Sequence, residues 1–328
     1  MSKLIIEPSP HIKSGVTTQK IMLSVIIALL PALVASVWIF GLRALIMVVI
    51  CCTSCVIFEW ACRKIMKRSN TISDLSAVVT GMLLAFNLPV TLPFYMAIIG
   101  CFAAIVIVKQ FFGGIGQNFV NPALAGRIVL LTSFPVAMST WTQPLTWTMS
   151  QLDGVTSASP LSSIHSMISG GSAPDVSLVE MLIGWRAGCL GETCAVALIL
   201  GGIYLVVRKV ISPTIPLTYI GTVAVIMLIA GKGDFRFVAY EILGGGLMLG
   251  AIFMATDYTT SPITFKGKII FGIGCGLITS VIRIFGNLPE GVSYSIIIMN
   301  ILVPLIENVT LPKPFGTPKK EKKEAEAK

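Results

Sequence analysis

The sequence predicts an all-α polytopic membrane protein. Hydrophobic residues make up 55% of its 328 residues, charged residues make up 12%, and the mean hydropathy is +0.88. Soluble domains carry about 25% charged residues, so an ordinary soluble fold is excluded. The net charge of +9 does not indicate a nucleic-acid-binding protein, because the lysines and arginines lie in short clusters between apolar runs, without interleaved aromatic residues.

Ten apolar segments are expected to form about ten transmembrane helices. Within a few residues at each end, they cover residues 20–41, 44–62, 75–88, 93–109, 119–134, 188–207, 214–230, 237–256, 268–286 and 291–309. The first segment does not have the pattern of a signal peptide, because about twenty residues precede it and no small-residue cleavage pattern follows.

The distribution of positive charge predicts that both termini lie in the cytoplasm. With the N-terminus inside, eighteen lysines and arginines fall on the inner side of the segments and five on the outer side, while Arg127 lies within a segment. Residues 128–185 contain no lysine or arginine at all. The loop after the fifth segment is therefore expected outside.

Similar stretches in the two halves predict an internal repeat. Lys109 aligns with Arg283 at an offset of 174 residues, and the Gly-Cys pairs ahead of these cations, at 100–101 and 274–275, align at the same offset. The two copies run in opposite directions through the expected membrane. The result is a five-plus-five inverted repeat, resembling the urea-transporter-like fold; chance similarity between glycine-rich membrane helices is the alternative.

The repeat divides the chain into five parts. They are a cytoplasmic N-terminal segment 1–19, a first transmembrane repeat 20–134, an external loop 135–187, a second transmembrane repeat 188–309 and a charged cytoplasmic tail 310–328.

Two polar helix ends are candidates for a site inside the membrane. The third segment is too short to span and ends at Asn87-Leu88-Pro89, and the polar run Thr256–Pro262 follows the eighth segment. Interrupted helices expose backbone groups, which is tolerated only where those groups are buried in protein or line a cavity. We therefore expect these ends to contribute to a central site, with turns at the membrane edge as the alternative.

Three polar residues are candidate members of this site: Arg127, Asn121 and Asp257. A charge at the centre of a membrane helix costs roughly 2.5–3.5 kcal/mol on insertion scales, so Arg127 is expected to form an ion pair or to bind carbonyl groups. Four glutamates lie near segment ends, where we expect them to reach water, with a part in an ion path as the alternative: Glu59, Glu192, Glu241 and Glu307.

The cysteines do not predict a metal site. Cys51, Cys52, Cys55 and Cys62 gather on the second segment, but the other four cysteines are scattered and no second cluster exists. A zinc or iron–sulfur site normally needs about four ligands that meet in space. We expect free thiols within the membrane and no disulfide framework.

A polar island lies in the expected external loop at residues 153–160. Asp153-Gly154 is a turn signal, and Ser159-Pro160 has the form of a helix N-cap followed by proline at the first helical position. A phosphate esterified to Ser159 would meet the positive end of that helix, an arrangement that Thr156 lacks. A Ser/Thr-rich loop that caps a helix is the alternative.

The island resembles the recognition motif of flavin transferases, and the whole chain resembles the RnfD/NqrB family, in particular the D subunits of Rnf ion-translocating ferredoxin:NAD oxidoreductase complexes. The stretches that carry this resemblance are Pro8–His11, Asp74–Thr80, Gly113–Ala123, Ser133–Val136, Asp153–Leu161 and Ala255–Asp257.

The resemblance implies a site for covalent FMN. The last hydroxyl of the motif, which accepts the flavin phosphate, corresponds to Ser159, and Thr156 is the alternative acceptor. Asp153 corresponds to the acidic start that the transferase recognises, and Gly154 and Ala158 are further motif positions. The family usually has Thr where this chain has Ser159, but a primary hydroxyl can form the same phosphoester.

The resemblance also implies the activity and the partners. The chain would relay electrons between ferredoxin and NAD within a complex that moves Na⁺ or H⁺ across a prokaryotic cytoplasmic (inner) membrane, and a second, noncovalent flavin such as riboflavin is implied. Because the chain has no glycine-rich dinucleotide fingerprint and no ferredoxin-type cysteine run, NAD and iron–sulfur chemistry is expected in partner subunits. A second flavinylated subunit and a flavin transferase are further expected partners.

Two other functions are compatible with parts of the sequence. A solute channel or secondary transporter of urea-transporter-like fold would explain the repeat and the interrupted helices but not the flavin motif. The B subunit of a sodium-pumping NADH:quinone oxidoreductase is a relative with a longer N-terminal extension than this chain has.

The topology can be tested with reporters fused after Ser150. Ser150 lies in the loop that is expected outside, so an alkaline phosphatase fusion there should be active and a green fluorescent protein fusion dark. The same two reporters placed after Lys67 should give the opposite pattern. A fluorescent fusion at Ser150 would contradict the charge-based orientation.

Overall fold

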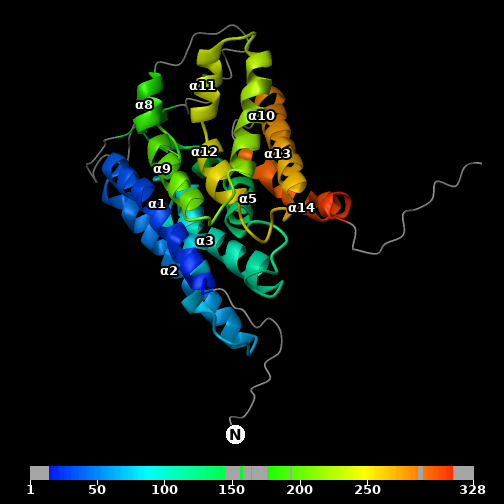
Figure 1. Cartoon of the computed structure of the whole chain (residues 1–328). Coiled ribbons are helices and arrows are strands. Elements are labelled where there is room, and N and C mark those ends of the chain that lie inside the picture. The colour runs from blue at the N-terminus through cyan, green and yellow to red at the C-terminus, as the bar shows by residue number, and fades with distance from the viewer. Residues whose placement is uncertain are drawn as a thin grey trace, which may run out of the picture.

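The computed structural model describes residues 15–142, 144, 156–157, 164, 176–192, 194–286 and 291–312. These residues form a bundle of helices with one two-stranded ladder (Figure 1). Within them, four helices are long and apolar enough to cross a membrane, or five if one bent helix pair is counted as a single span. The chain is a multi-pass helical membrane protein, as its composition predicts.

The first half of the chain contains helices that match the first five predicted segments. They are α1 (Thr18–Phe40), α2 (Leu42–Ile65), α3 (Ser76–Phe86), α4 (Phe94–Phe102) with its π-helical continuation η2 (Ala103–Gln110), and α5 (Pro122–Ser133). A 3-10 turn, η1 (Ile72–Asp74), precedes α3. The third predicted segment is indeed a short helix of 11 residues that ends at Asn87.

The connection and the second half follow. The connection contains α6 (Pro135–Met138), the strands β1 (Trp141–Thr142) and β2 (Thr156–Ser157), and α8 (Leu178–Ile183). The second half contains α9 (Ala195–Val207), α10 (Thr214–Ala230), α11 (Phe235–Leu243), α12 (Leu247–Leu249), η3 (Gly250–Met254), α13 (Phe265–Phe285) and α14 (Val292–Thr310). Each of the last five predicted segments contains helical structure.

The eighth segment is not one continuous helix, so the expectation for residues 237–256 was wrong in this respect. α11 ends at Leu243, and the helix formed by α12 and η3 leaves it at an angle of 66°. Three consecutive glycines, Gly244–Gly246, make the break possible, and Gly245 has a φ of 63°. Arg283 stabilises the exposed helix end, because its guanidinium donates to the carbonyl oxygens of Glu241 (2.6 Å) and Gly244 (3.1 Å).

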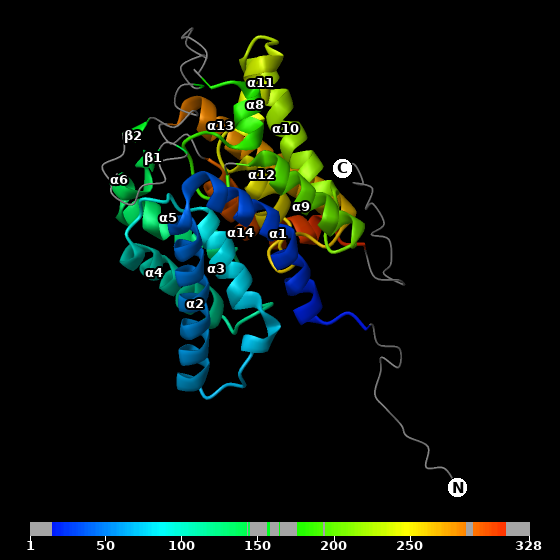
Figure 2. The same ribbon diagram turned by 90° about the vertical axis from the view of Figure 1, so that its left-hand side faces the viewer.

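Helices of the two halves contact each other. α1 packs against α9, and α5 contacts α14, while α2 packs on α3 and α4 in the first half and α10 on α13 in the second. In Figure 2, α1 (dark blue) and α9 (green) lie near each other in the middle of the molecule. The polar ends of α3 and η3 lie within this junction, which positions the site described below.

Gly81 allows α2 and α3 to approach closely. A Cβ atom at this position would lie 2.8 Å from both the Cys51 carbonyl oxygen and the Cys52 Cα atom, which is nearer than real side chains approach backbone. Small residues are common at helix interfaces in membranes. Lipid is as apolar as the side chains, so the hydrophobic effect does not drive helices together there, and close van der Waals packing stabilises the contact instead.

Gly81→Ala should therefore destabilise the protein. The added methyl group pushes against backbone atoms that cannot rotate away, and overpacking of this kind costs about 1–3 kcal/mol. The measurement is the thermal unfolding midpoint of the purified protein in detergent. Gly221→Ala is the matched control, because Gly221 lies in α10 with no atom within 4 Å of its Cβ position. Equal midpoints for the two variants would contradict the packing argument.

Candidate functional site

A polar cluster centred on Arg127 lies at the junction of the two halves. Arg127 projects from α5 and is only 2% exposed. Its Nη1 donates to Asn87 Oδ1 (2.9 Å) at the end of α3 and to Ser293 Oγ (3.0 Å) at the start of α14. Its Nη2 donates to Cys189 Sγ (3.7 Å) and lies 3.8 Å from Glu192 Oε1. The expected ion pair of Arg127 is confirmed, with Glu192 as its partner.

The two interrupted helix ends meet beside this cluster, as the sequence predicts. Asn87 Nδ2 donates to Leu83 O (2.7 Å) in its own helix and to Met254 Sδ (3.6 Å) at the end of η3. Asn121 caps α5, since its Oδ1 accepts from the backbone amide of Ala123 (3.0 Å), while its Nδ2 donates to Met254 O (3.2 Å). Backbone groups exposed by the breaks are thus bound by asparagine side chains, as an apolar environment requires.

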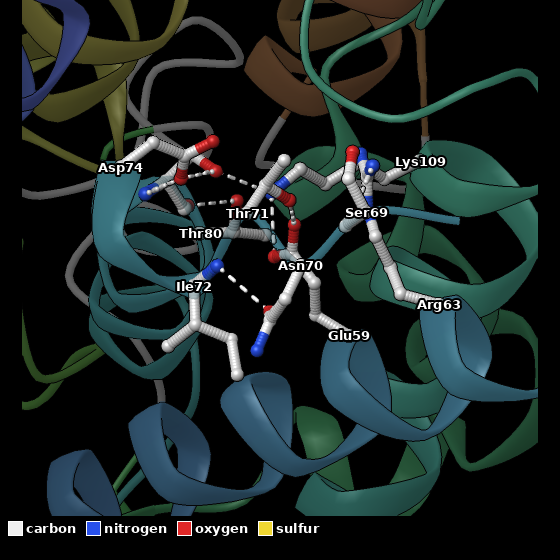
Figure 3. Close-up of polar contacts among 10 residues, drawn as sticks. Glu59, Arg63, Ser69, Asn70, Thr71, Ile72, Asp74, Thr80 and Lys109 are labelled. Atoms are coloured by element: carbon white, nitrogen blue, oxygen red, sulfur yellow. Dashed lines mark hydrogen bonds and ion pairs between the residues drawn. The ribbon is translucent and has the colours of Figure 1, made fainter. Parts of the chain in front are cut away.

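A second polar cluster joins α2, α3 and η2 (Figure 3). Lys109 Nζ lies 2.9 Å from Glu59 Oε2 and donates to Ser76 Oγ (2.6 Å). The other carboxylate oxygen of Glu59 accepts from Thr71 Oγ1 (3.0 Å), and Ser76 Oγ donates to Asp74 Oδ1 (2.6 Å). These contacts form a continuous polar chain from Asp74, near the surface, to a fully buried glutamate.

Three of the glutamates expected to reach water are buried ion-pair partners instead. Glu59, Glu192 and Glu241 are 0%, 5% and 2% exposed. Glu241 Oε2 lies 2.9 Å from Arg283 Nη1, so Lys109 and Arg283, the aligned cations of the repeat, each pair with a buried glutamate. Glu307 remains partly exposed, and its Oε1 accepts from the Ile263 amide (3.2 Å). The sequence contained a hint of the Lys109 and Arg283 pairs: two aligned cations within apolar segments, each of which needs an anionic partner once it is buried.

A cavity of about 380 Å³ lies beside the second cluster, with Ser76 and Lys109 in its lining. Such a volume is within the range of about 300–1,000 Å³ found for small-molecule sites. Its apolar lining comes from several helices and includes Met22, Val25, Val79, Leu83, Leu205 and Phe253, and its polar lining includes Ser76, Thr80, Lys109, Asn118, Asn121 and Asp257. The structure therefore brings two of the three candidate residues, Asn121 and Asp257, to one cavity, whereas Arg127 lies outside its lining.

Asp257 is held in the loop that follows η3. Its Oδ2 accepts from the hydroxyl groups of Thr259 (3.0 Å) and Thr260 (3.2 Å). Burial raises the pKa of the Asp257 carboxyl, and the hydrogen bonds from Thr259 and Thr260 act in the opposite direction. The polar run after the eighth segment thus forms a structured wall of the cavity.

Most of the predicted flavin-attachment motif lies outside the described residues. This holds for Asp153, Gly154, Ala158 and Ser159. Thr156 lies in β2, where its backbone pairs with Thr142 of β1 in antiparallel register. The motif therefore stays a prediction.

The described cysteines are free thiols.

Comparison with known proteins assigns the chain to a family. The model of the NQR2, RnfD, RnfE family matches residues 5–316. The chain belongs to this family. It is 48% identical to the D subunit of the Na⁺-translocating ferredoxin:NAD⁺ oxidoreductase complex of Acetobacterium woodii, over 99% of this chain and 98% of that one.

Two further relatives of the same family match over nearly their whole length. The D subunit of the proton-translocating ferredoxin:NAD⁺ oxidoreductase complex of Clostridium ljungdahlii is 42% identical, over 95% of this chain and 96% of the relative. The D subunit of the ion-translocating oxidoreductase complex of Actinobacillus succinogenes is 36% identical, over 94% and 96%. The resemblance seen in the sequence motifs is thereby confirmed at the level of the family.

Lys109→Met should destabilise the protein by about 3–5 kcal/mol, because it leaves the Glu59 carboxylate buried without a counter-charge. The combined variant Lys109→Met with Glu59→Leu should recover much of that loss, since no lone charge then remains. Arg68→Met is the control: Arg68 is an exposed cation just after α2, the helix that carries Glu59, and its loss should have little effect. Chemical denaturation of the purified protein measures all three; a double variant less stable than Lys109→Met would contradict the ion-pair account.

Proposed function

We propose that this chain is the membrane-embedded D component of an Rnf-type complex, in which electron transfer between ferredoxin and NAD⁺ is coupled to translocation of Na⁺ or H⁺. The observation that carries the proposal is similarity over the whole chain to proteins of that name, at 48% and 42% identity. The chain would act only within the assembly, as part of an oxidoreductase and translocase.

The electron carrier of this chain is FMN bound covalently through a phosphoester to Ser159, with Thr156 as the alternative acceptor. The residue pattern from Asp153 to Ser159 supports this, since it supplies an acidic start, Ala158 and a terminal hydroxyl. Pairing of β2 with β1 supports it further, because the ladder ties the segment around Thr156 to the helical domain. A flavin transferase would form the phosphoester.

The transmembrane helices form a five-plus-five inverted repeat, with α1 to α5 in one copy and α9 to α14 in the other. Contacts between α1 and α9, and between α5 and α14, support this arrangement. Corresponding helices of inverted copies meet where the pseudo-two-fold axis passes between them. The pairing of both Lys109 and Arg283 with buried glutamates supports the same alignment. We also propose that the repeat has a urea-transporter-like fold.

The protein lies in the prokaryotic cytoplasmic membrane with both termini inside and the flavin loop outside. The supporting observation is the excess of lysine and arginine on one side of the helices.

The cavity fits a second, noncovalent flavin such as riboflavin. Its volume of about 380 Å³ and its apolar side walls suit a flat aromatic ring, and its polar side chains suit the polar ring edge. A flavin bound here would exchange electrons with its neighbours, while Lys109 and Asp257 would set the electrostatic field around it. Ferredoxin, NAD and iron–sulfur chemistry would be handled by partner subunits, among them a second flavinylated one.

The names of the relatives favour this function over the two alternatives. The relatives reported above are named as subunits of Rnf-type complexes, and none of these names describes a solute channel or a sodium-pumping NADH:quinone oxidoreductase. The inverted repeat would then serve as a scaffold that holds redox groups at fixed positions.

Covalent flavin can be detected directly. We expect the denatured chain, produced together with a flavin transferase, to show yellow fluorescence at its own position in a gel under ultraviolet light. The solution recovered after denaturation should contain additional flavin that was bound without a covalent link. A chain that never carries in-gel fluorescence would contradict the electron-carrier role and favour a transporter.

The acceptor residue is decided by two variants. Ser159→Ala should abolish the in-gel fluorescence, because no hydroxyl remains at the phosphoester position, and Thr156→Ala should retain it. Peptide mass mapping locates the FMN in the wild-type chain. Retention in Ser159→Ala together with loss in Thr156→Ala would assign the flavin to Thr156 instead.

A further inference from the structure

Three buried ionisable side chains near the C-terminal end of α2 carry a net positive charge. Glu59, Arg63 and Lys109 are 0%, 7% and 3% exposed. Lys109 neutralises Glu59, and Asp74, a half-buried carboxylate of the same cluster, is linked to Lys109 through Ser76. No ion pair of Arg63 with either carboxylate is found within the part of the chain that the structure describes. An uncompensated charge in such a place is costly, which indicates that an anion from outside the chain completes the cluster.

The guanidinium of Arg63 lies against the glycine-rich loop after η2. A Cβ atom at Gly114 would collide with Arg63 Nη2, and Gly114 has a φ of 106°, so only glycine fits here. Arg63 Nη1 donates to Ser69 O (3.1 Å), as Figure 3 shows, whereas Nε has no partner in the described residues. The loop thus fixes the guanidinium and leaves part of its donor capacity unused.

A second polar side chain near Gly114 is equally short of partners. Gln110 is fully buried at the end of η2, and neither its amide oxygen nor its amide nitrogen has a hydrogen-bond partner among the described residues. Its Oε1 lies 3.8 Å from the position that a Cβ atom of residue 114 would take, and Arg63 Nη2 lies next to the same position. Buried amides are normally hydrogen-bonded, so this position has unmet hydrogen-bonding capacity beside an unpaired charge.

The surroundings place this cluster at the level of lipid headgroups. Lys64 Nζ lies 4.7 Å from the ring centre of Trp60, an aromatic and cationic pair typical of the membrane interface. Large apolar side chains remain exposed nearby, with exposed fractions of 80% for Ile65 and 63% for Phe111. The anion is therefore expected to come with an apolar body attached to it.

Exposed cations flank the buried one. Lys64, Lys67 and Arg68 follow Arg63 within five residues and are exposed. Fixing the orientation of the chain in the membrane would account for these exposed charges, but that role does not require the burial of Arg63 against Gly114. Four cations in the last turn of a membrane helix and directly after it also match the pattern of anionic-lipid recognition.

We propose that Arg63, flanked by Lys64 and Arg68, binds the phosphate of an anionic phospholipid headgroup. The planar guanidinium suits phosphate because it can donate two parallel hydrogen bonds, and the acyl chains would lie along the exposed apolar face of α2. The proposed topology enters only in naming the leaflet, the cytoplasmic one. Binding itself is independent of whether the chain carries flavin, so either proposal can fail without the other.

The test uses the full-length chain, purified and delipidated in detergent. Native mass spectrometry with phosphatidylglycerol and with phosphatidylcholine measures lipid binding, and inorganic phosphate is added in a separate arm. We expect wild type to prefer phosphatidylglycerol and Arg63→Gln to bind it about tenfold more weakly, the loss of one charge-assisted contact. Arg63→Lys should fall between them. Arg208→Gln, at the exposed end of α9, should equal wild type.

Several outcomes would overturn the proposal. They are equal binding of the two lipids by wild type, an unchanged preference in Arg63→Gln, and displacement of phosphatidylglycerol by millimolar inorganic phosphate, which would indicate a site for free phosphate. Loss of the lipid preference when the chain is purified in its assembled complex would assign the site to an acidic partner surface. If Arg63→Gln does not fold, the combined variant Lys64→Gln with Arg68→Gln must weaken the preference for the proposal to stand.

Discussion

Pairing of buried charges is the constraint on which the rest of this structure depends. An apolar surrounding offers no water to a charged side chain, so each charge must find its partner within the protein. The pairs Lys109–Glu59, Arg127–Glu192 and Arg283–Glu241 each join elements that are distant in the sequence. They therefore do more than neutralise charge. Lys109–Glu59 and Arg283–Glu241 hold helices together within each half, and Arg127–Glu192 joins the two halves.

The same constraint explains how broken helices persist in the interior. The end of α11 is capped by Arg283, and the ends of α3 and η3 are bound by Asn87 and Asn121. Each cap satisfies backbone groups that an unbroken helix would have satisfied itself. The breaks in turn leave room for a cavity with polar walls, among apolar helices that would otherwise pack without a gap. A cavity with polar walls thus follows from the caps.

Much of the fold could be predicted from local sequence. The apolar segments locate the helices, because length and hydropathy are properties of a stretch and not of its neighbours, and α10 spans the predicted residues 214–230. Asn121-Pro122 starts α5 for an equally local reason, since the cap contacts lie within three residues. The break at Gly244–Gly246 was missed, although three glycines were visible, because glycine is common in membrane helices and a break needs a cap such as Arg283, 39 residues away.

Composition and motifs alone established the class of the protein, its family and the residue pattern expected to carry flavin, because these depend on residue identity and spacing. The partners of the buried charges required the folded structure. Glu59 and Glu241 lie near helix ends, where a glutamate can turn to water as readily as to a cation, and the sequence does not say which side faces the protein. Packing of α2 against η2, and the approach of Arg283 of α13 to the end of α11, turned these glutamates inward, where they neutralise Lys109 and Arg283.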